Sequence, residues 1–156
     1  MNKLTHYITV SLKHVLVLLM SVLVIDVCWQ VFSRYVLQDP SSFTDELARY
    51  LLIWLSLLGA AYVTGKDEHI AIDLLSKKMN ATANVVLKNS LVLFFSLSVL
   101  VFGGIYLVTT MLALEQLSAT LQIPMGYIYL VIPLSGFIMC YYSVANLISF
   151  FKEGRD

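Results

Sequence analysis

The sequence predicts an all-α integral membrane protein with four membrane-spanning helices. Apolar residues make up 59% of the 156-residue chain and charged residues only 13%, against about 25% in ordinary globular proteins. No charged residue lies between Lys88 and Glu115, or between Glu115 and Lys152. Runs of about 20 apolar residues are long enough to cross a bilayer. Their continuous, non-alternating pattern favours helices over barrel strands.

We expect one membrane domain over residues 1–156, with spans at about 14–37, 46–65, 84–114 and 126–151. The first span contains Asp26, so its insertion needs an argument. Between Val15 and Val36 lie 13 Val, Leu, Ile and Phe residues, which together favour insertion by about 4–8 kcal/mol against a cost of about 3 kcal/mol for a central aspartate. Pro133 should kink the fourth span, because proline lacks an N–H and clashes with the preceding turn.

The distribution of Lys and Arg predicts the orientation. Eight of these residues lie at the termini and in the second loop, and two lie in the first loop region. Because cytoplasmic loops carry the excess of positive charge, both termini should be cytoplasmic. The eight are Lys3, Lys13, Lys66, Lys77, Lys78, Lys88, Lys152 and Arg155, and the two are Arg34 and Arg49.

The second loop contains a candidate amphipathic helix at about residues 70–79, with apolar and polar side chains on opposite faces. We expect it to lie on the inner membrane surface, in contact with lipid. A solvated loop is the alternative. His69 and Asp73 share a helical face at this point, but no further His or Cys lies near them, so we expect no metal site.

Polar residues in the first span line up at helical spacing. Asp26, Gln30 and Arg34 are four residues apart and share one face. An acid inside a membrane is by default a functional hypothesis, here an ion or proton site. The alternative is a structural seam that joins this helix to its neighbour. We favour the seam, because Arg34 offers charge compensation and Asp26 lies away from the midplane.

The hairpin between the first two spans is dense in charge. Ser42-Phe43-Thr44-Asp45 resembles a capping box, and Thr44-Asp45-Glu46 is an acidic helix start. Glu46 and Arg49 are three residues apart and can pair, and Arg34 can reach across to Asp45 or Glu46. Such exposed pairs contribute at most about 1 kcal/mol. We therefore interpret the cluster as serving shape and partner recognition, with ordinary capping as the alternative.

Small residues gather on one side of the second span. Their small side chains let another helix approach closely, and Gly103-Gly104 in the third span should do the same. Internal packing and a subunit contact explain this face equally well. The small residues are Ser56, Gly59, Ala60, Ala61 and Thr64.

Catalytic and cofactor patterns are missing from the sequence. It has no Gly-rich phosphate loop, no paired catalytic acids, no CxxC motif and no histidine inside a span that could ligate haem. The net charge is formally zero, so nothing favours nucleic acid. We expect neither an enzyme nor a cofactor in this chain, and we expect Cys28 and Cys140 to be small core residues.

Several short motifs together resemble a known family over roughly residues 10–150. The motifs are Arg34-Tyr35, Thr44–Tyr50, Trp54, Gly59–Ala61, His69–Asp73, Ile123–Met125, Tyr129 and Pro133. With these motifs the chain is similar to the small membrane subunit, or DctQ-type component, of tripartite ATP-independent periplasmic (TRAP) transporters. One departure is Gly126, where bulkier residues are common, so the start of the fourth span should pack more loosely.

The resemblance implies a scaffold role in the bacterial inner membrane. Its expected partners are a large membrane subunit of the DctM type, which carries the substrate and sodium sites, and a periplasmic substrate-binding protein of the DctP type. Family substrates are mostly organic acids, such as C4-dicarboxylates and sialic acids. The alternative function is a small proton-coupled homodimeric exporter that uses Asp26.

Overall fold

The computed structural model describes residues 3–39, 41–66 and 81–153. In this part of the chain, four helical stretches are long and apolar enough to cross a membrane, at Thr5–Leu37, Ser42–Lys66, Val85–Ala113 and Met125–Phe150. The predicted four-span fold is confirmed. The helices are α1 (Lys3–Phe32), continued by the π-helix η1 (Ser33–Leu37), α2 (Ser42–Lys66), α4 (Ala81–Phe95), the π-helix η2 (Ser96–Gly103), α5 (Gly104–Ala113), α6 (Met125–Tyr129) and α7 (Val131–Glu153).

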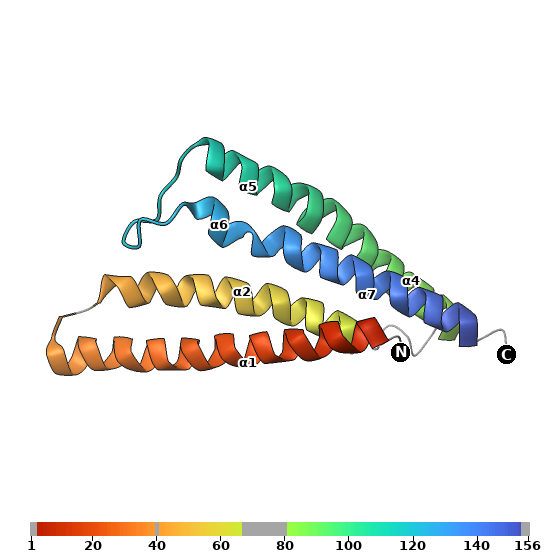
Figure 1. The fold of residues 1–156 in the computed structure, drawn as a ribbon, viewed down its shortest axis with the longest axis horizontal. Coiled ribbons are helices and arrows are strands. Elements are labelled where there is room, and N and C mark those ends of the chain that lie inside the picture. Colours follow the sequence, from red (N-terminus) through yellow and green to blue (C-terminus); the bar gives the residue numbers. More distant parts are fainter. Residues whose placement is uncertain (1–2, 40, 67–80, 154–156) are drawn as a thin grey trace.

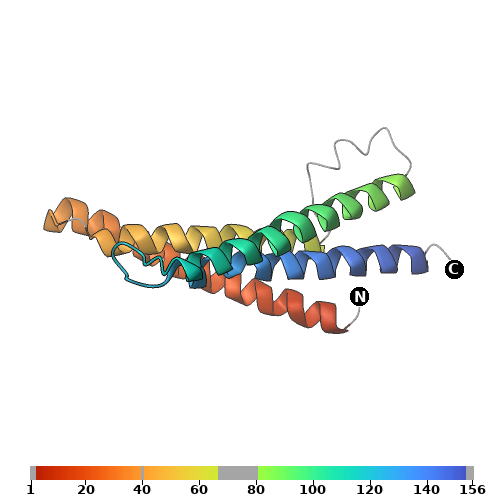
Figure 2. The ribbon, with the colours of Figure 1, turned by 90° about the horizontal axis from the view of Figure 1, so that it is seen from above.

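The helices form a layer in the order α1, α2, α7 and α4–α5 (Figure 1). The start of α1 and the end of α7 lie at one end, which we call the terminal end. The α1–α2 connection and the α5–α6 loop lie at the other, which we call the loop end. Figure 2 shows the helices overlapping toward the loop end and diverging toward the terminal end.

The core of this layer is small. Many large apolar side chains are exposed, among them Phe94 at 74% and Tyr106 at 75%. A membrane protein leaves such side chains to lipid or to partner helices. The buried cluster comprises Leu12, Leu58, Ala61, Leu100, Val131, Met139 and Tyr142.

Two helices begin before the expected membrane spans. The first helix begins at Lys3 and the second at Ser42. A helix need not stop at the membrane surface, and the start of α1 contacts α7. There the Thr9 and Tyr142 hydroxyls lie 2.8 Å apart. The two π-helices were not anticipated.

Glycines set the closest helix contacts. A Cβ on Gly104 would lie 2.9 Å from Pro133 Cδ, whereas one on Gly103 would meet nothing nearer than 3.9 Å. The predicted close approach therefore holds for Gly104 alone. The expectation of loose packing at Gly126 was wrong, because a Cβ there would lie 2.5 Å from Leu112 Cγ. Because Gly126 has no side chain, Leu112 of α5 can pack directly against it.

The fourth span is interrupted where Pro133 predicts a kink. Helix α6 ends at Tyr129, four residues before Pro133, and α7 begins at Val131. Proline has no N–H to give to the carbonyl four residues earlier, so the helix cannot run through unbroken. Beside this break, the Trp54 indole Nε1 donates to the Ile128 carbonyl at 2.9 Å. Trp54 thus ties α2 to the interrupted span.

Candidate functional site at the loop end

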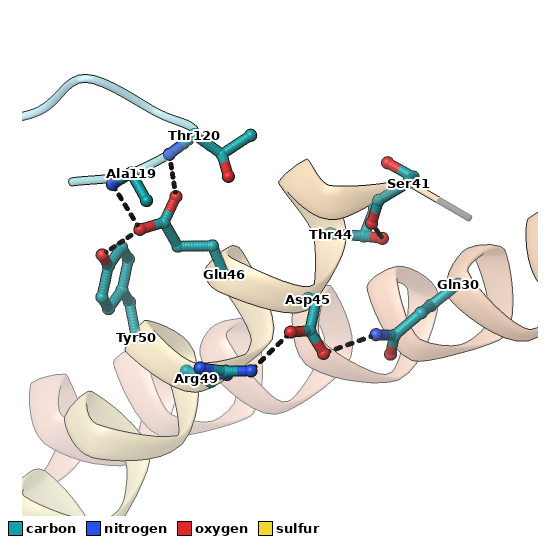
Figure 3. Close-up of polar contacts among 9 residues, drawn as sticks. All are labelled: Gln30, Ser41, Thr44, Asp45, Glu46, Arg49, Tyr50, Ala119 and Thr120. Carbon is teal, nitrogen blue, oxygen red and sulfur yellow. Dashed lines mark hydrogen bonds and ion pairs between the residues drawn. The ribbon is translucent and has the colours of Figure 1, made fainter. Parts of the chain in front are cut away.

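A polar cluster occupies the first two turns of α2 (Figure 3). Its members are Asp45, Glu46, Arg49 and Tyr50. Residues four apart stack on one helical face, so Asp45 lies above Arg49 and Glu46 above Tyr50. The two pairs point in different directions and make different contacts, the first toward α1 and the second toward the α5–α6 loop.

Glu46 is the acceptor for four hydrogen bonds. Its Oε1 accepts from the Tyr50 hydroxyl at 2.6 Å and from the Ala119 N–H at 3.1 Å. Its Oε2 accepts from the Thr120 N–H at 2.8 Å and the Leu121 N–H at 3.1 Å. Consecutive backbone N–H groups on a turn make a concave site for anions. Glu46 thereby fastens the α5–α6 loop to α2.

The α5–α6 loop is closed by its own backbone contacts as well. Ser118 N–H donates to the Ile123 carbonyl at 2.9 Å, and Met125 N–H to the Gln116 carbonyl at 2.8 Å. Gln122 has φ 53°, a left-handed conformation that non-glycine residues adopt only when their surroundings enforce it. These contacts brace the loop across its two ends. Pro124, a predicted site residue, ends it by bridging to Leu117 and preceding α6.

Asp45 joins α2 to α1. Its Oδ1 accepts from Gln30 Nε2 at 2.9 Å, and its Oδ2 from Arg49 Nη2 at 2.6 Å. The predicted Glu46–Arg49 pair was wrong, because the loop N–H groups take Glu46 and leave Arg49 to Asp45. The capping box predicted at Ser42–Asp45 was also wrong, because the Asp45 carboxylate accepts from Gln30 and Arg49 instead. The Thr44 hydroxyl donates to the Ser41 carbonyl at 2.9 Å.

The predicted seam on the first span is realised only in part. Gln30 crosses to Asp45, but Arg34 is exposed on η1 and pairs with neither carboxylate in the described part of the chain. Arg34 lies in the π-helix η1, whereas Asp26 and Gln30 lie in α1. Asp26 is only 7% exposed, and its Oδ2 has no hydrogen-bond partner among the described residues.

The predicted small-residue face of α2 is divided. Ser56 and Ala60 are exposed, and a Cβ on Gly59 would meet no atom within 4 Å. Ala61 and Thr64 are buried inside the chain instead. The first set is thus free for lipid or a partner helix, while the second serves internal packing. Cys28 is exposed rather than in the core, and Cys140 is half-buried.

The remaining predictions in the second loop are not tested. His69, Asp73 and the proposed interfacial helix at residues 70–79 lie outside the described residues. Within residues 3–39, 41–66 and 81–153, no three His, Cys, Asp or Glu side chains come together to hold a metal. The sequence placed Tyr50 in a family motif but predicted no contact for it, and it did not indicate the N–H groups of residues 119–121. Backbone donors have no sequence signature.

Fold and site define a multi-pass helical membrane protein with a fixed polar surface at one end. Residues 15–153 match the family model of the tripartite ATP-independent periplasmic transporters, DctQ component. The chain belongs to this family of transporter subunits.

Curated relatives agree with this assignment. The chain is 24% identical over 151 residues to a putative TRAP transporter small permease protein of Haemophilus influenzae, covering 96% of this chain and 92% of the relative. It is 36% identical over 90 residues to the sialic acid TRAP transporter small permease protein SiaQ of Vibrio cholerae, covering 58% and 50%. It is 26% identical over 116 residues to the C4-dicarboxylate TRAP transporter small permease protein DctQ of Rhodobacter capsulatus, covering 72% and 51%.

Proposed function

We propose that this chain is the scaffold subunit of a sodium-coupled TRAP transporter that imports an organic acid across the bacterial inner membrane. The substrate is of the C4-dicarboxylate or sialic-acid type. Two relatives with those substrates in their names support this class. The sodium sites belong to the large partner subunit, and this chain carries no cofactor and no catalytic residue of its own.

The partners we propose are a large membrane subunit of the DctM type and a periplasmic binding protein of the DctP type. The family description, a tripartite periplasmic transporter, supports two further components. A helical layer with many exposed apolar side chains leaves a wide surface for a larger membrane protein. The exposed Ser56 and Ala60, beside the open Gly59, suit close helix packing there.

One observation carries the docking role, namely that Glu46 accepts hydrogen bonds from three consecutive N–H groups of the α5–α6 loop. A preorganised surface binds with a smaller entropic cost than a mobile one. Exposed Arg49, paired with Asp45, adds charge to the same end of the layer. Charge complementarity at such a rim steers encounter more than it adds affinity.

The orientation we propose puts the loop end in the periplasm. The start of α1 and the end of α7 share one end of the layer, as an even number of spans requires. The excess of Lys and Arg favours the cytoplasm for that end. The α5–α6 loop then faces the compartment of the binding protein.

A proton-coupled homodimeric exporter is the second candidate. The buried, unpartnered Oδ2 of Asp26 favours it, because an ionisable group inside a membrane often marks a proton path. The scaffold is preferred, since Asp26 has no second titratable partner among the described residues, whereas a proton relay uses a chain of such groups.

Mass spectrometry of the detergent-extracted native complex distinguishes these functions. The scaffold function predicts that this chain co-purifies with one large membrane polypeptide. A stable homodimer without another membrane polypeptide would reject it and favour the exporter.

A further inference from the structure

Three consecutive backbone N–H groups at the tip of the α5–α6 loop converge on one carboxylate. Ala119, Thr120 and Leu121 all donate to Glu46, at 3.1, 2.8 and 3.1 Å. Figure 3 shows the first two of these contacts, with the loop folded over the carboxylate. The two oxygens are shared among the three donors, as in the concave backbone sites that bind anions in other folds.

The shape of this site is set by the loop and its ends. The Ser118–Ile123 and Gln116–Met125 contacts close the ring, and Gln122 turns it with φ 53°. Leu121 N–H has a second, longer contact with the Ser118 hydroxyl at 3.3 Å. The loop is therefore built around an anion position, and the anion comes from a different helical hairpin.

Tyr50 positions the occupant. Its hydroxyl donates to Glu46 Oε1 at 2.6 Å and lies 3.4 Å from Met125 Sδ. The phenol thus contacts both the carboxylate and the first residue of α6. The Tyr50 hydroxyl thereby holds Oε1 of Glu46 at the position where the Ala119 N–H also donates to it.

We propose that the tip of the α5–α6 loop is a carboxylate-binding site whose resident ligand is Glu46. Because Glu46 is carried on α2, its carboxylate holds this loop on α2 and joins the α1–α2 and α4–α7 hairpins at the loop end. The proposal concerns this chain alone and holds whether or not the scaffold function is correct. Removal of the side chain leaves a vacant site that a small external carboxylate fills.

Chemical rescue tests this in the membrane-embedded full chain. A nitroxide is attached at Thr120→Cys, whose exposed side chain leaves the backbone N–H in place, with Cys28 and Cys140 replaced by alanine. Glu46→Ala should increase the mobility of this label several-fold. Sodium formate should restore the slow motion, and sodium chloride at equal ionic strength should not.

Two variants serve as controls. Glu115→Gln removes an exposed carboxylate from the same loop and should leave the label slow. Glu46→Gln keeps the side-chain volume but offers one acceptor oxygen, so the label should become faster and formate should not slow it. If Glu46→Ala does not insert into the membrane, the mobility of the label in Glu46→Gln tests the proposal. An unchanged label in either Glu46 variant, or equal rescue by chloride and formate, would overturn the proposal.

Discussion

At the loop end, α2 meets the α5–α6 loop through a carboxylate and three backbone N–H groups. In the middle of the layer, α5 meets α7 through Gly104, whose missing side chain leaves room for the Pro133 ring. Lipid provides no hydrophobic force between helices, so interior contacts depend on close packing. The loop end depends on matched donors and acceptors. We therefore expect added atoms to destabilise the interior. We expect the loop end to tolerate changes that keep both acceptor oxygens of Glu46.

The largest expected effect is an added methyl group in the interior. Gly104→Ala places a Cβ 2.9 Å from Pro133 Cδ and 3.0 Å from Pro133 N, and neither the ring nor the backbone can rotate away. We expect a loss of about 1–3 kcal/mol, measured as a lower midpoint of thermal unfolding in detergent. Gly103→Ala is the matched control, because its Cβ meets nothing nearer than 3.9 Å. Equal midpoints for the two variants would contradict the packing account.

Loss of a partly buried hydrogen bond should lower stability nearly as much. Trp54→Phe removes the indole N–H and leaves the Ile128 carbonyl without this donor beside the break before Pro133. An unsatisfied carbonyl in an apolar setting costs about 1–3 kcal/mol. Trp29→Phe provides the comparison, since Trp29 is 52% exposed and contacts Phe32 through its ring. The same thermal measurement applies, and a Trp54 variant as stable as the Trp29 variant would refute this role.

A smaller effect, here on uptake by the complete transporter, is expected from replacing Asp26, which lies on the α1 face that also carries Gln30. Asp26→Asn keeps the shape of the side chain and removes the charge. We expect normal assembly and partial retention of sodium-driven uptake by the complete transporter. Normal assembly with complete loss of uptake would show that Asp26 takes part in ion coupling.

The smallest effect should come from the surface ion pair. Arg49 and Asp45 are joined at 2.6 Å, but their side chains are 73% and 48% exposed. Arg49→Gln should therefore change the unfolding free energy by about 0.5 kcal/mol or less, and high salt should remove the difference. A large, salt-independent loss would mean that Arg49 has a structural role not visible in its contacts.

The four spans could be predicted because a bilayer demands long apolar runs, and the gaps between charges such as Lys88 and Glu115 mark them. The break near Pro133 follows equally directly from the missing N–H. The π-helix at Ser33–Leu37 could not be predicted, because nothing in its sequence, Ser-Arg-Tyr-Val-Leu, distinguishes it from an ordinary helical turn. The pairing of Arg34 with Asp45 or Glu46, which the sequence allows, is not formed in the described part of the chain.

The loop-end site was only half predictable. The run Thr44–Tyr50 indicates a functional helix start, but spacing alone allows Arg49 to pair with Asp45 or with Glu46. The choice depends on backbone donors 73 to 75 residues away in sequence. Local sequence patterns contain no information on contacts between residues so far apart. The contacts of this site could therefore be identified only from the fold.

Reconstitution into liposomes tests the central claim, that this chain is an accessory subunit with no transport of its own. Purified chain is inserted alone, with the large membrane subunit, and with the large subunit plus the binding protein. A sodium gradient is then imposed. We predict organic-acid uptake only in the complete system, and none above empty vesicles with this chain alone. Robust uptake by this chain alone would contradict the scaffold assignment.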